Sequence, residues 1–251
     1  MKATPQSFYD NLAPRYHLIF ADWEASIAWQ AEVLNRLIRA EWGDGVTSVL
    51  DVACGIGTQA LGLAQHGYAV TASDRSPQMV ARAKREADLR GLAIEVSVAD
   101  MRRVHRHHQQ MFDVLIACDN AVPHLLSDDD ILDAFRAFYR CVEPGGGCLI
   151  TVRDYDAVER SGTRVIPYGV RENDGARYLI FQVWTFDGPH YDLAMYFVQD
   201  DGSAEGTAHI FRSRYYAVSP ARLEALLREA GFVDVHRAES DYYQPVIVGS
   251  R

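Results

Sequence analysis

The segment VLDVACGIGTQA (residues 49–60) is the most informative part of the chain for the fold. It joins an apolar run, typical of a buried strand, to the turn Gly55-Ile56-Gly57 and then to the start of a helical pattern. Such a turn presents the backbone N–H groups of a helix N-terminus to an anionic ligand group. The glycines fit the fingerprint of a dinucleotide site, but Asp51 at the strand end would repel a pyrophosphate. The same carboxylate would attract a ligand that carries an ammonium group near the turn.

Strand-like and helical patterns alternate around this segment. Apolar runs bounded by turn residues occupy residues 48–53, 68–73, 93–99, 112–118 and 147–153. Helical patterns lie between them at 58–67, 76–91 and 127–146; the second begins with Ser76-Pro77, and the third is expected to stop at Pro144-Gly145. This order predicts βαβ units and an α/β, Rossmann-like, doubly wound parallel sheet. The carboxyl ends of its strands share one edge, where ligands bind.

After Tyr155 the pattern changes to long, aromatic-rich runs without helices between them. The runs TRVIPYGVR, ARYLIFQVWTF, HYDLAMYFVQDD and TAHIFRSRYYAV are separated by turn residues, which predicts about four antiparallel strands. A helical pattern at 219–232 and two further strand-like runs follow. We therefore expect one domain over residues 1–251, with an antiparallel β lobe inserted at 160–217, after the fifth strand.

Composition narrows the class of protein. The 25 basic and 34 acidic residues give a net charge of −9, which argues against a nucleic-acid partner. The apolar runs are too short to span a bilayer, and the N-terminal segment lacks the apolar core of a signal peptide, so no membrane partner is expected. The four cysteines show no C-x-x-C spacing and are expected to be buried free thiols in a cytoplasmic protein. The sequence does not indicate the oligomeric state.

Three carboxylates follow three successive strands. Besides Asp51, Asp74 ends the second strand, where nucleoside-binding folds place an acid on the ribose hydroxyls; the alternative is a cap of the next helix. Asp100 ends the third strand and precedes Met101, a pair that can bind an adenine amino group and cover its ring. The alternative for Asp100 is a loop aspartate. Together with the glycine turn, the three acids favour a nucleoside with an ammonium group, and S-adenosylmethionine is such a molecule.

These segments resemble a known family. VLDVACGIGTQALGLA (49–64), TASDRSPQMV (71–80), VADM (98–101) and the VEPGG turn (142–146) resemble class I S-adenosylmethionine-dependent methyltransferases. The resemblance implies a seven-stranded sheet whose last strand is antiparallel. In such enzymes the N-terminal segment often folds over the cofactor, so Tyr9 and Tyr16 either close the pocket or belong to a packing helix. The implied cofactor residues are Asp51, Gly55, Gly57, Asp74, Arg75, Asp100, Met101 and Tyr16.

A narrower resemblance concerns the methyl acceptor. CDNAVPHLL (118–126), VRDYDAV (152–158) and the pair Tyr215-Tyr216 are similar to segments of the glycine N-methyltransferase group. This similarity implies that Arg153 holds an amino-acid carboxylate and that Asn120 gives its amide oxygen to the amine. His124 is either a base for a hydroxyl acceptor or a packed histidine. For Arg153 the alternative is a surface ion pair with Asp154 or Asp156.

The predicted function is methyl transfer from S-adenosylmethionine to a small-molecule acceptor, such as the amine of glycine or sarcosine. Three alternatives stay open: an O-methyltransferase, a nicotinamide-dependent oxidoreductase that uses the glycine turn, and a binding module without turnover. No metal is expected. The cluster His105, His107 and His108 has no carboxylate or cysteine at ligand spacing and is interpreted as a solvated loop.

Overall fold

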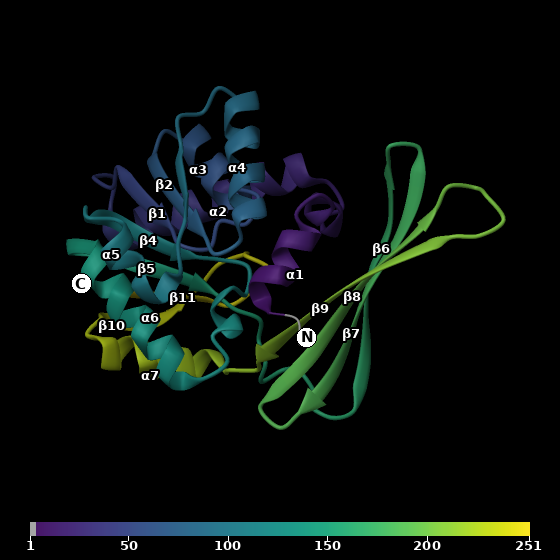
Figure 1. Cartoon of the computed structure of the whole chain (residues 1–251). Helices are drawn as coiled ribbons and strands as arrows, with labels where there is room; N and C mark the ends of the chain where they lie inside the picture. Colours follow the sequence, from purple (N-terminus) through teal and green to yellow (C-terminus); the bar gives the residue numbers. More distant parts are fainter. Residues whose placement is uncertain (1–3) are drawn as a thin grey trace.

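The computed structural model describes residues 4–251, and its larger sheet has seven strands in the order β10-β11-β5-β4-β1-β2-β3 (Figure 1). The strands from β1 to β5 run parallel, and β11 runs antiparallel to both of its neighbours. The predicted Rossmann-like sheet with an antiparallel last strand is thus confirmed. Its strands are β1 (Ser48–Asp51), β2 (Ala69–Asp74), β3 (Glu95–Val98), β4 (Phe112–Ala117), β5 (Val142–Thr151), β10 (Val233–Ala238) and β11 (Val246–Ser250).

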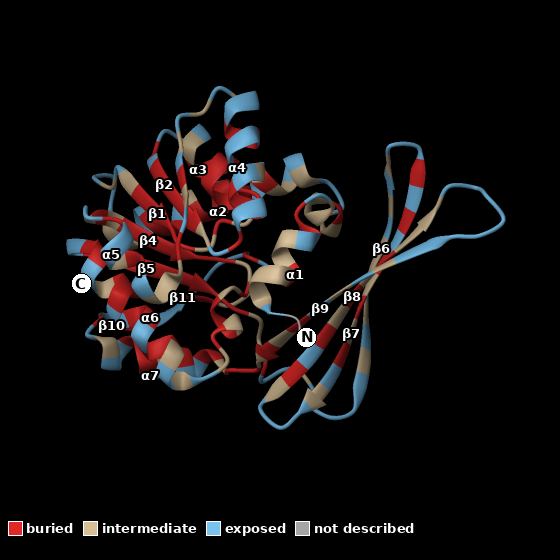
Figure 2. Ribbon diagram, in the orientation of Figure 1, coloured by how far each residue is buried: buried red, intermediate tan, exposed pale blue. Residues whose placement is uncertain are grey.

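Helices cover both faces of this sheet. Successive strand residues point to opposite faces, so Val49 packs with α2 (Trp23–Trp42), α3 (Thr58–Gln65) and α4 (Pro77–Leu89), whereas Leu50 packs with the other layer. That layer consists of α5 (Val104–His107), α6 (Asp128–Cys141) and α7 (Pro220–Ala230). Because both faces are covered, most residues of the central strands are buried (Figure 2). None of the described helices is long and apolar enough to span a membrane.

The aromatic-rich segment forms a separate antiparallel sheet with the order β6-β7-β8-β9. Its strands are β6 (Thr163–Asn173), β7 (Ala176–Asp187), β8 (His190–Asp200) and β9 (Thr207–Tyr216). Asp174-Gly175 joins β6 to β7, and both residues have positive φ, 51° and 78°, as a tight hairpin turn requires. Near the other sheet this lobe is buried on one face, while its far end projects into solvent (Figures 1 and 2).

The N-terminal segment lies between the two sheets. Helix α1 (Pro5–Leu12) begins at the capping residue Thr4, contacts β9 and α4, and is followed by the 3-10 turn η1 (Tyr16–Ile19). Figure 1 shows α1 between the doubly wound sheet and the lobe. Two further 3-10 turns, η2 (Met101–Arg103) and η3 (Val122–His124), follow β3 and β4 at the edge where ligands are expected.

Two local expectations differ from the structure, and one helix had no counterpart among them. Helix α6 ends at Cys141, and Pro144-Gly145 lies inside β5, because Gly146 and Gly147 let this strand pass close to Asp113 and Trp42. The histidine cluster is not a solvated loop: it belongs to α5 and the residue after it, and His108 is buried against Phe112. The 20-residue helix α2 was not predicted. The four cysteines are free and buried, as expected.

Candidate active site

A cleft opens at the carboxyl ends of β1, β2, β3 and β4. We call it the cofactor cleft. Most of the residues that the sequence assigns to the cofactor line it, and His124 lines it as well. The lining residues from the predicted cofactor set are Tyr16, Gly55, Asp74, Arg75, Asp100 and Met101. Asp51 and Gly57 are not in the cavity lining.

The two glycines of the turn have different physical roles. Both have positive φ, 54° at Gly55 and 99° at Gly57, which favours glycine. A Cβ on Gly55 would meet no atom within 4 Å, so this part of the turn leaves open space. A Cβ on Gly57 would lie 3.2 Å from Leu61 and 3.6 Å from Ala83. Gly57 therefore allows α3 to begin and to pack against α4, while Gly55 borders the cleft.

Asp74 ties β2 to the glycine turn. Its Oδ2 accepts a hydrogen bond of 2.9 Å from the backbone N–H of Gly55, and its Oδ1 accepts one of 2.8 Å from Ser76. Burial raises the pKa of Asp74 above its usual value. The cap of α4 is Ser76, whose hydroxyl accepts from the backbone of Met79, so the capping alternative for Asp74 is wrong. The carboxylate lies on the cleft wall with two of its lone pairs used.

Asp51 is a buried carboxyl with one unsatisfied oxygen. Oδ1 accepts a hydrogen bond of 3.1 Å from the backbone of Ala53, whereas Oδ2 has no partner within residues 4–251. Burial raises the pKa of Asp51 to about 8, and the nearby acids Asp74 and Asp119 add to this effect. An orphaned buried carboxylate is unfavourable unless a cation or a donor satisfies it. This atom fits the ammonium group of S-adenosylmethionine, and the open space at Gly55 fits its neighbouring carboxylate.

Asp100 is held rigidly at the far end of the cleft. Arg102 donates to it from its backbone N–H, from Nε and from Nη2, at 3.0, 3.1 and 2.7 Å. Burial by itself would raise the pKa of Asp100, but these hydrogen bonds and the charge of Arg102 lower it overall. Arg75 lies 4.0 Å from the same carboxylate, and Met101 is half-buried beside it. The carboxylate is therefore charged and held in one orientation on the cleft wall.

A second cavity adjoins the cofactor cleft, and we call it the acceptor cavity. Asn120 and Arg153 line it, and aromatic residues of the lobe form its wall. Three residues line both cavities: Tyr9, Tyr16 and Asp119. The lobe contributes Tyr168, Gln182, Tyr191, Leu193, Met195 and Tyr215.

Arg153 is not a surface ion-pair residue. Its guanidinium carbon lies 4.3 Å from the ring centroid of Trp184, and within residues 4–251 no carboxylate approaches it within 4.0 Å. Asp156 pairs instead with Arg160, at 3.1 Å. The ion-pair alternative is therefore wrong, and the cation at the acceptor cavity has an aromatic platform but no counter-charge.

Asn120 is already engaged at both ends of its amide. Its Oδ1 accepts a hydrogen bond of 3.1 Å from the backbone N–H of Arg153, and its Nδ2 donates one of 2.8 Å to the hydroxyl of Tyr155. We expected the amide oxygen to serve an acceptor amine. In the structure this oxygen holds the Arg153 backbone through one of its two lone pairs, so Asn120 positions the arginine beside the cavity, and its role toward an amine stays a prediction.

His124 is a packed histidine. Its Nε2 lies 2.7 Å from the hydroxyl of Tyr9, and its ring centroid lies 4.0 Å from that of Tyr215. Burial lowers the pKa of His124 to about 3. The imidazole is thus neutral and a weak base, and it joins η3 to α1 and to the lobe.

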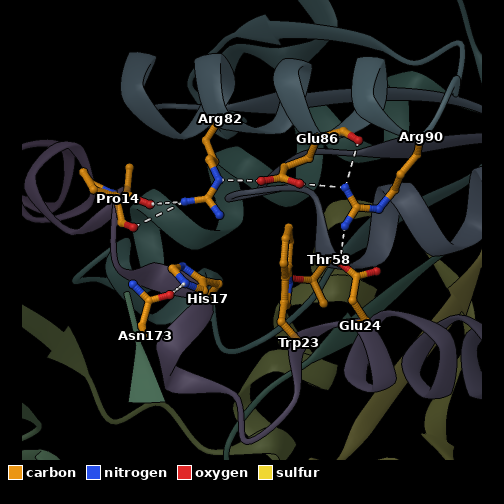
Figure 3. A network of polar contacts seen from close by, with 10 residues as sticks. Pro14, His17, Trp23, Glu24, Thr58, Arg82, Glu86, Arg90 and Asn173 are labelled. Atoms are coloured by element: carbon orange, nitrogen blue, oxygen red, sulfur yellow. Dashed lines mark hydrogen bonds and ion pairs between the residues drawn. The ribbon is translucent and has the colours of Figure 1, made fainter. Parts of the chain in front are cut away.

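A network of polar contacts holds the N-terminal segment beside the cleft (Figure 3). Trp23 lies between the guanidinium groups of Arg82 and Arg90, whose central carbons are 5.7 and 5.3 Å from the centroid of its ring. The ring Nε1–H donates a hydrogen bond of 2.9 Å to Thr58 Oγ1. Glu86 bridges the two arginines, at 2.7 and 2.6 Å. Further contacts run from Arg82 to the carbonyl oxygens of Ala13 and Pro14, from Arg90 to Glu24, and from His17 to Asn173 of β6. These contacts anchor the segment at Ala13–Pro14 and from His17 to Glu24, which lie on either side of Tyr16.

One strand-end acid escaped the sequence analysis. Asp119 lies just after β4, in the same position relative to its strand as the three acids already described. A search for acids at strand ends would therefore have found it. Asp119 and Asn120 both have positive φ, 57° and 65°. The tyrosine partners of Asp119 are Tyr242 and Tyr243. They lie more than a hundred residues away in the sequence, so no pattern around Asp119 indicates them.

Comparisons with known proteins agree with this geometry. Residues 49–146 match a family model described as a methyltransferase domain. A glycine/sarcosine N-methyltransferase of Parasynechococcus marenigrum (strain WH8102) is 31% identical over 160 residues, which cover 64% of this chain and 55% of that protein. The chain thus spans about half the length of this relative and of two other glycine/sarcosine N-methyltransferases.

Solved structures show the same fold. DesVI of Streptomyces venezuelae superposes with a TM-score of 0.80 at 19% identity, covering 95% of this chain and 97% of that chain. The sugar N-methyltransferase KedS8 of a Streptoalloteichus species superposes with a TM-score of 0.77 at 21% identity, covering 100% and 95%. With a methyltransferase domain matched over residues 49–146, its sheet order and these relatives, the chain is similar to class I S-adenosylmethionine-dependent methyltransferases and, among them, to glycine/sarcosine N-methyltransferases.

Proposed function

We propose that this protein transfers a methyl group from S-adenosylmethionine to the amine of a small acceptor that carries a carboxylate. The observation that carries the proposal is the Arg153 guanidinium, which borders the acceptor cavity without a counter-charge within residues 4–251. A partly buried cation gains most from a bidentate carboxylate. The relative from Parasynechococcus is named for glycine and sarcosine, which are small amines with a carboxylate.

The cofactor cleft has the donors and acceptors that S-adenosylmethionine requires. The open space at Gly55 suits its amino-acid end, Asp74 suits the ribose hydroxyls, and Asp100 with Met101 suits the adenine. Asp51 is not part of the cleft lining, and its buried free oxygen is proposed to attract the ammonium group of the cofactor. When bound, this cofactor supplies a methyl group that is already activated by the positive sulfur. What the chain itself supplies is position and the exclusion of water. Tyr9 and Tyr16, which line both cavities, are proposed to close the passage between them.

The lobe is proposed to be the acceptor side of the molecule. It provides the ring of Trp184 under Arg153 and the hydroxyls of Tyr168, Tyr191 and Tyr215 around the same cavity. These groups leave an acceptor carboxylate with donors on several sides. The structure gives less support to methylation of an oxygen. The base expected for that reaction, His124, is a weak base because burial lowers its pKa to about 3, and its Nε2 is hydrogen-bonded to the hydroxyl of Tyr9.

The test is the release of S-adenosylhomocysteine from S-adenosylmethionine with a panel of amines. Glycine, sarcosine and alanine are compared with methylamine, dimethylamine and ethylamine, which lack the carboxylate. We expect turnover with members of the first group and much less with their counterparts. Tight binding of S-adenosylhomocysteine in calorimetry without turnover of any amine would contradict the proposal and favour a binding module. Thermal stabilisation by NAD(H) alone would contradict the cofactor as well.

A further inference from the structure

Asp119 has no role in the function proposed so far, although it lines both cavities. Its side chain accepts hydrogen bonds from Gln59 at 2.7 Å, from the hydroxyl of Tyr242 at 3.0 Å and from the hydroxyl of Tyr243. Within residues 4–251 no lysine, arginine or histidine nitrogen lies within 4.0 Å of it. The carboxylate is therefore held firmly by neutral donors, while its charge has no partner.

The backbone does not explain why this residue is charged. With φ at 57°, the position favours glycine or asparagine at least as much as aspartate. Asparagine would also accept from the tyrosine hydroxyls through its amide oxygen. A negative charge here is unfavourable in the free protein, because Asp119 is half-buried and its charge lies near enough to Asp51 to raise the pKa of that acid. A charge that is costly for stability points to a cationic ligand.

The acceptor cavity thus carries two charges without counter-charges in the described residues 4–251. Arg153 lies over Trp184 on the lobe side, and Asp119 lies at the passage to the cofactor cleft. The two charges do not form an ion pair with one another. A molecule with a carboxylate at one end and an ammonium at the other matches both. The ammonium end would then lie at the passage, which is where a methyl group must cross.

We propose that Asp119 binds the ammonium group of the acceptor and takes one of its protons, a role that rests on the proposed function. In this step an N–H bond of the ammonium breaks, an O–H bond forms on Asp119, and the electron pair stays on the nitrogen. The nitrogen is then a neutral nucleophile with its lone pair free. The proton later leaves to solvent at the mouth of the cavity, where Tyr243 is 53% exposed. Asp119 would be a catalytic residue, since it touches the reacting nitrogen.

The surroundings suit such a proton acceptor. Burial raises the pKa of Asp119, and hydrogen bonds from Tyr243, Gln59 and Tyr242 limit this rise. An alkyl ammonium has a pKa of about 10, so nearly all of the acceptor is protonated at neutral pH. The titratable groups that face Asp119 are Asp51 of β1, Cys118 next to it, Tyr16 of η1, Tyr168 of β6, and Tyr242 and Tyr243. Burial keeps each of these hydroxyl and thiol groups neutral by raising its pKa.

The test is Asp119→Asn in the full chain, because asparagine tolerates the left-handed backbone and keeps an oxygen for the tyrosines. Asp174→Asn is the matched control: it removes a charge from another left-handed aspartate, with φ at 51°, which is exposed in the β6–β7 turn. For each protein, kcat/KM with sarcosine or glycine is measured from neutral pH up to the pKa of the amine. Calorimetry measures the affinity for S-adenosylhomocysteine.

We expect Asp119→Asn to lower kcat/KM at neutral pH by about tenfold or more, the loss typical of a charge-assisted hydrogen bond. The deficit should shrink as the pH approaches the pKa of the amine, because the free amine needs neither a charge partner nor a base. Asp174→Asn should match the wild type. Affinity for S-adenosylhomocysteine should hardly change.

Three results would overturn the proposal. Equal pH profiles for Asp119→Asn and the wild type would remove any role in the reaction. A deficit that stays constant with pH would assign a structural role to Asp119. Loss of affinity for S-adenosylhomocysteine with unchanged acceptor kinetics would assign it to the cofactor ammonium. If the wild type itself methylates no amine, the proposed function falls together with this one, whereas the first three results leave it standing.

Discussion

Several ionisable side chains in this protein lie where they add little stability to the ligand-free molecule. Asp51 leaves one oxygen unsatisfied, Arg153 has a ring but no carboxylate within residues 4–251, and Asp119 has donors but no cation there. Residues of this kind are costly for folding, and they concentrate at sites that bind or react. The substitutions that matter most are therefore those that change charge and preserve shape.

Asp51→Asn tests the cost of the first of these charges. Because the pKa of Asp51 is raised from 3.8 to about 8, the folded state binds the proton more tightly than the unfolded state does. The stability of the free wild type should therefore fall as the pH rises from about 4 to about 8. We expect Asp51→Asn to be more stable than the wild type at the upper end of this window and similar at its lower end. Thermal unfolding at several pH values measures this, and parallel curves for the two proteins would contradict it.

Arg153→Lys tests whether the guanidinium binds the carboxylate of the acceptor. A lysine keeps the charge but cannot reproduce the planar, two-point contact or the stacking on Trp184. We expect the KM of the best carboxylate-bearing acceptor to rise by about 10- to 100-fold, which corresponds to roughly 1.5–3 kcal/mol for hydrogen bonds to a charged group. Affinity for S-adenosylhomocysteine should stay the same. Arg177→Lys, at an exposed ion pair with Asp200, is the control. Wild-type kinetics in Arg153→Lys would exclude a carboxylate acceptor while leaving methyl transfer in place.

At the scale of elements, close packing of α2 on α3 fixes the layer that supports the glycine turn. Gly62 is the contact point: a Cβ there would lie 2.5 Å from Ala31 Cβ and 2.8 Å from the carbonyl oxygen of Ile27. Both distances are below normal contact, so the helices would have to separate. The turn at Gly55 precedes α3 directly and would move with it.

Gly62→Ala should lower the free energy of unfolding by about 1–3 kcal/mol, the usual cost of overpacking a buried contact. This outcome is opposite to the small gain that alanine brings in an unconstrained helix. The control is Gly45→Ala, where a Cβ would meet no atom within 4 Å and φ is not positive. Urea unfolding of both variants measures the difference. A stability of Gly62→Ala equal to that of the wild type would show that α2 and α3 are less tightly packed than the structure has them.

At the scale of the whole molecule, the N-terminal segment connects the two sheets. It lines both cavities through Tyr9 and Tyr16, and Asp10 accepts a hydrogen bond of 2.5 Å from Ser76 Oγ beside the cleft. On the other side, Arg171 of β6 donates to the carbonyl oxygen of Phe20 at 2.7 Å. A ligand in the cleft would thus contact a segment that also holds the lobe.

We expect S-adenosylhomocysteine to slow amide hydrogen exchange in residues 5–20, because bound ligand suppresses local opening of the segment over it. Exchange in the loop at residues 201–206, at the far end of the lobe, should not change and serves as the internal control. Unchanged exchange in residues 5–20, with binding verified by calorimetry, would mean that this segment is a packing element and not a closure over the cofactor.

Local sequence patterns were sufficient to predict the doubly wound sheet, the antiparallel insertion and the sheet edge at which the strand-end acids meet. These features depend on periodicity and on topology: alternating apolar runs imply parallel strands, and acids that follow such strands meet at one edge. For that reason the sequence correctly places Asp74 and Asp100 on the cleft. The partners of each charge, in contrast, depend on tertiary contacts. Trp184 reaches Arg153 from the lobe, and Tyr242 and Tyr243 reach Asp119 from the loop after β10. Such contacts join side chains that are distant in the chain, so no local pattern encodes them, and only the packed molecule shows which charges it leaves for a ligand.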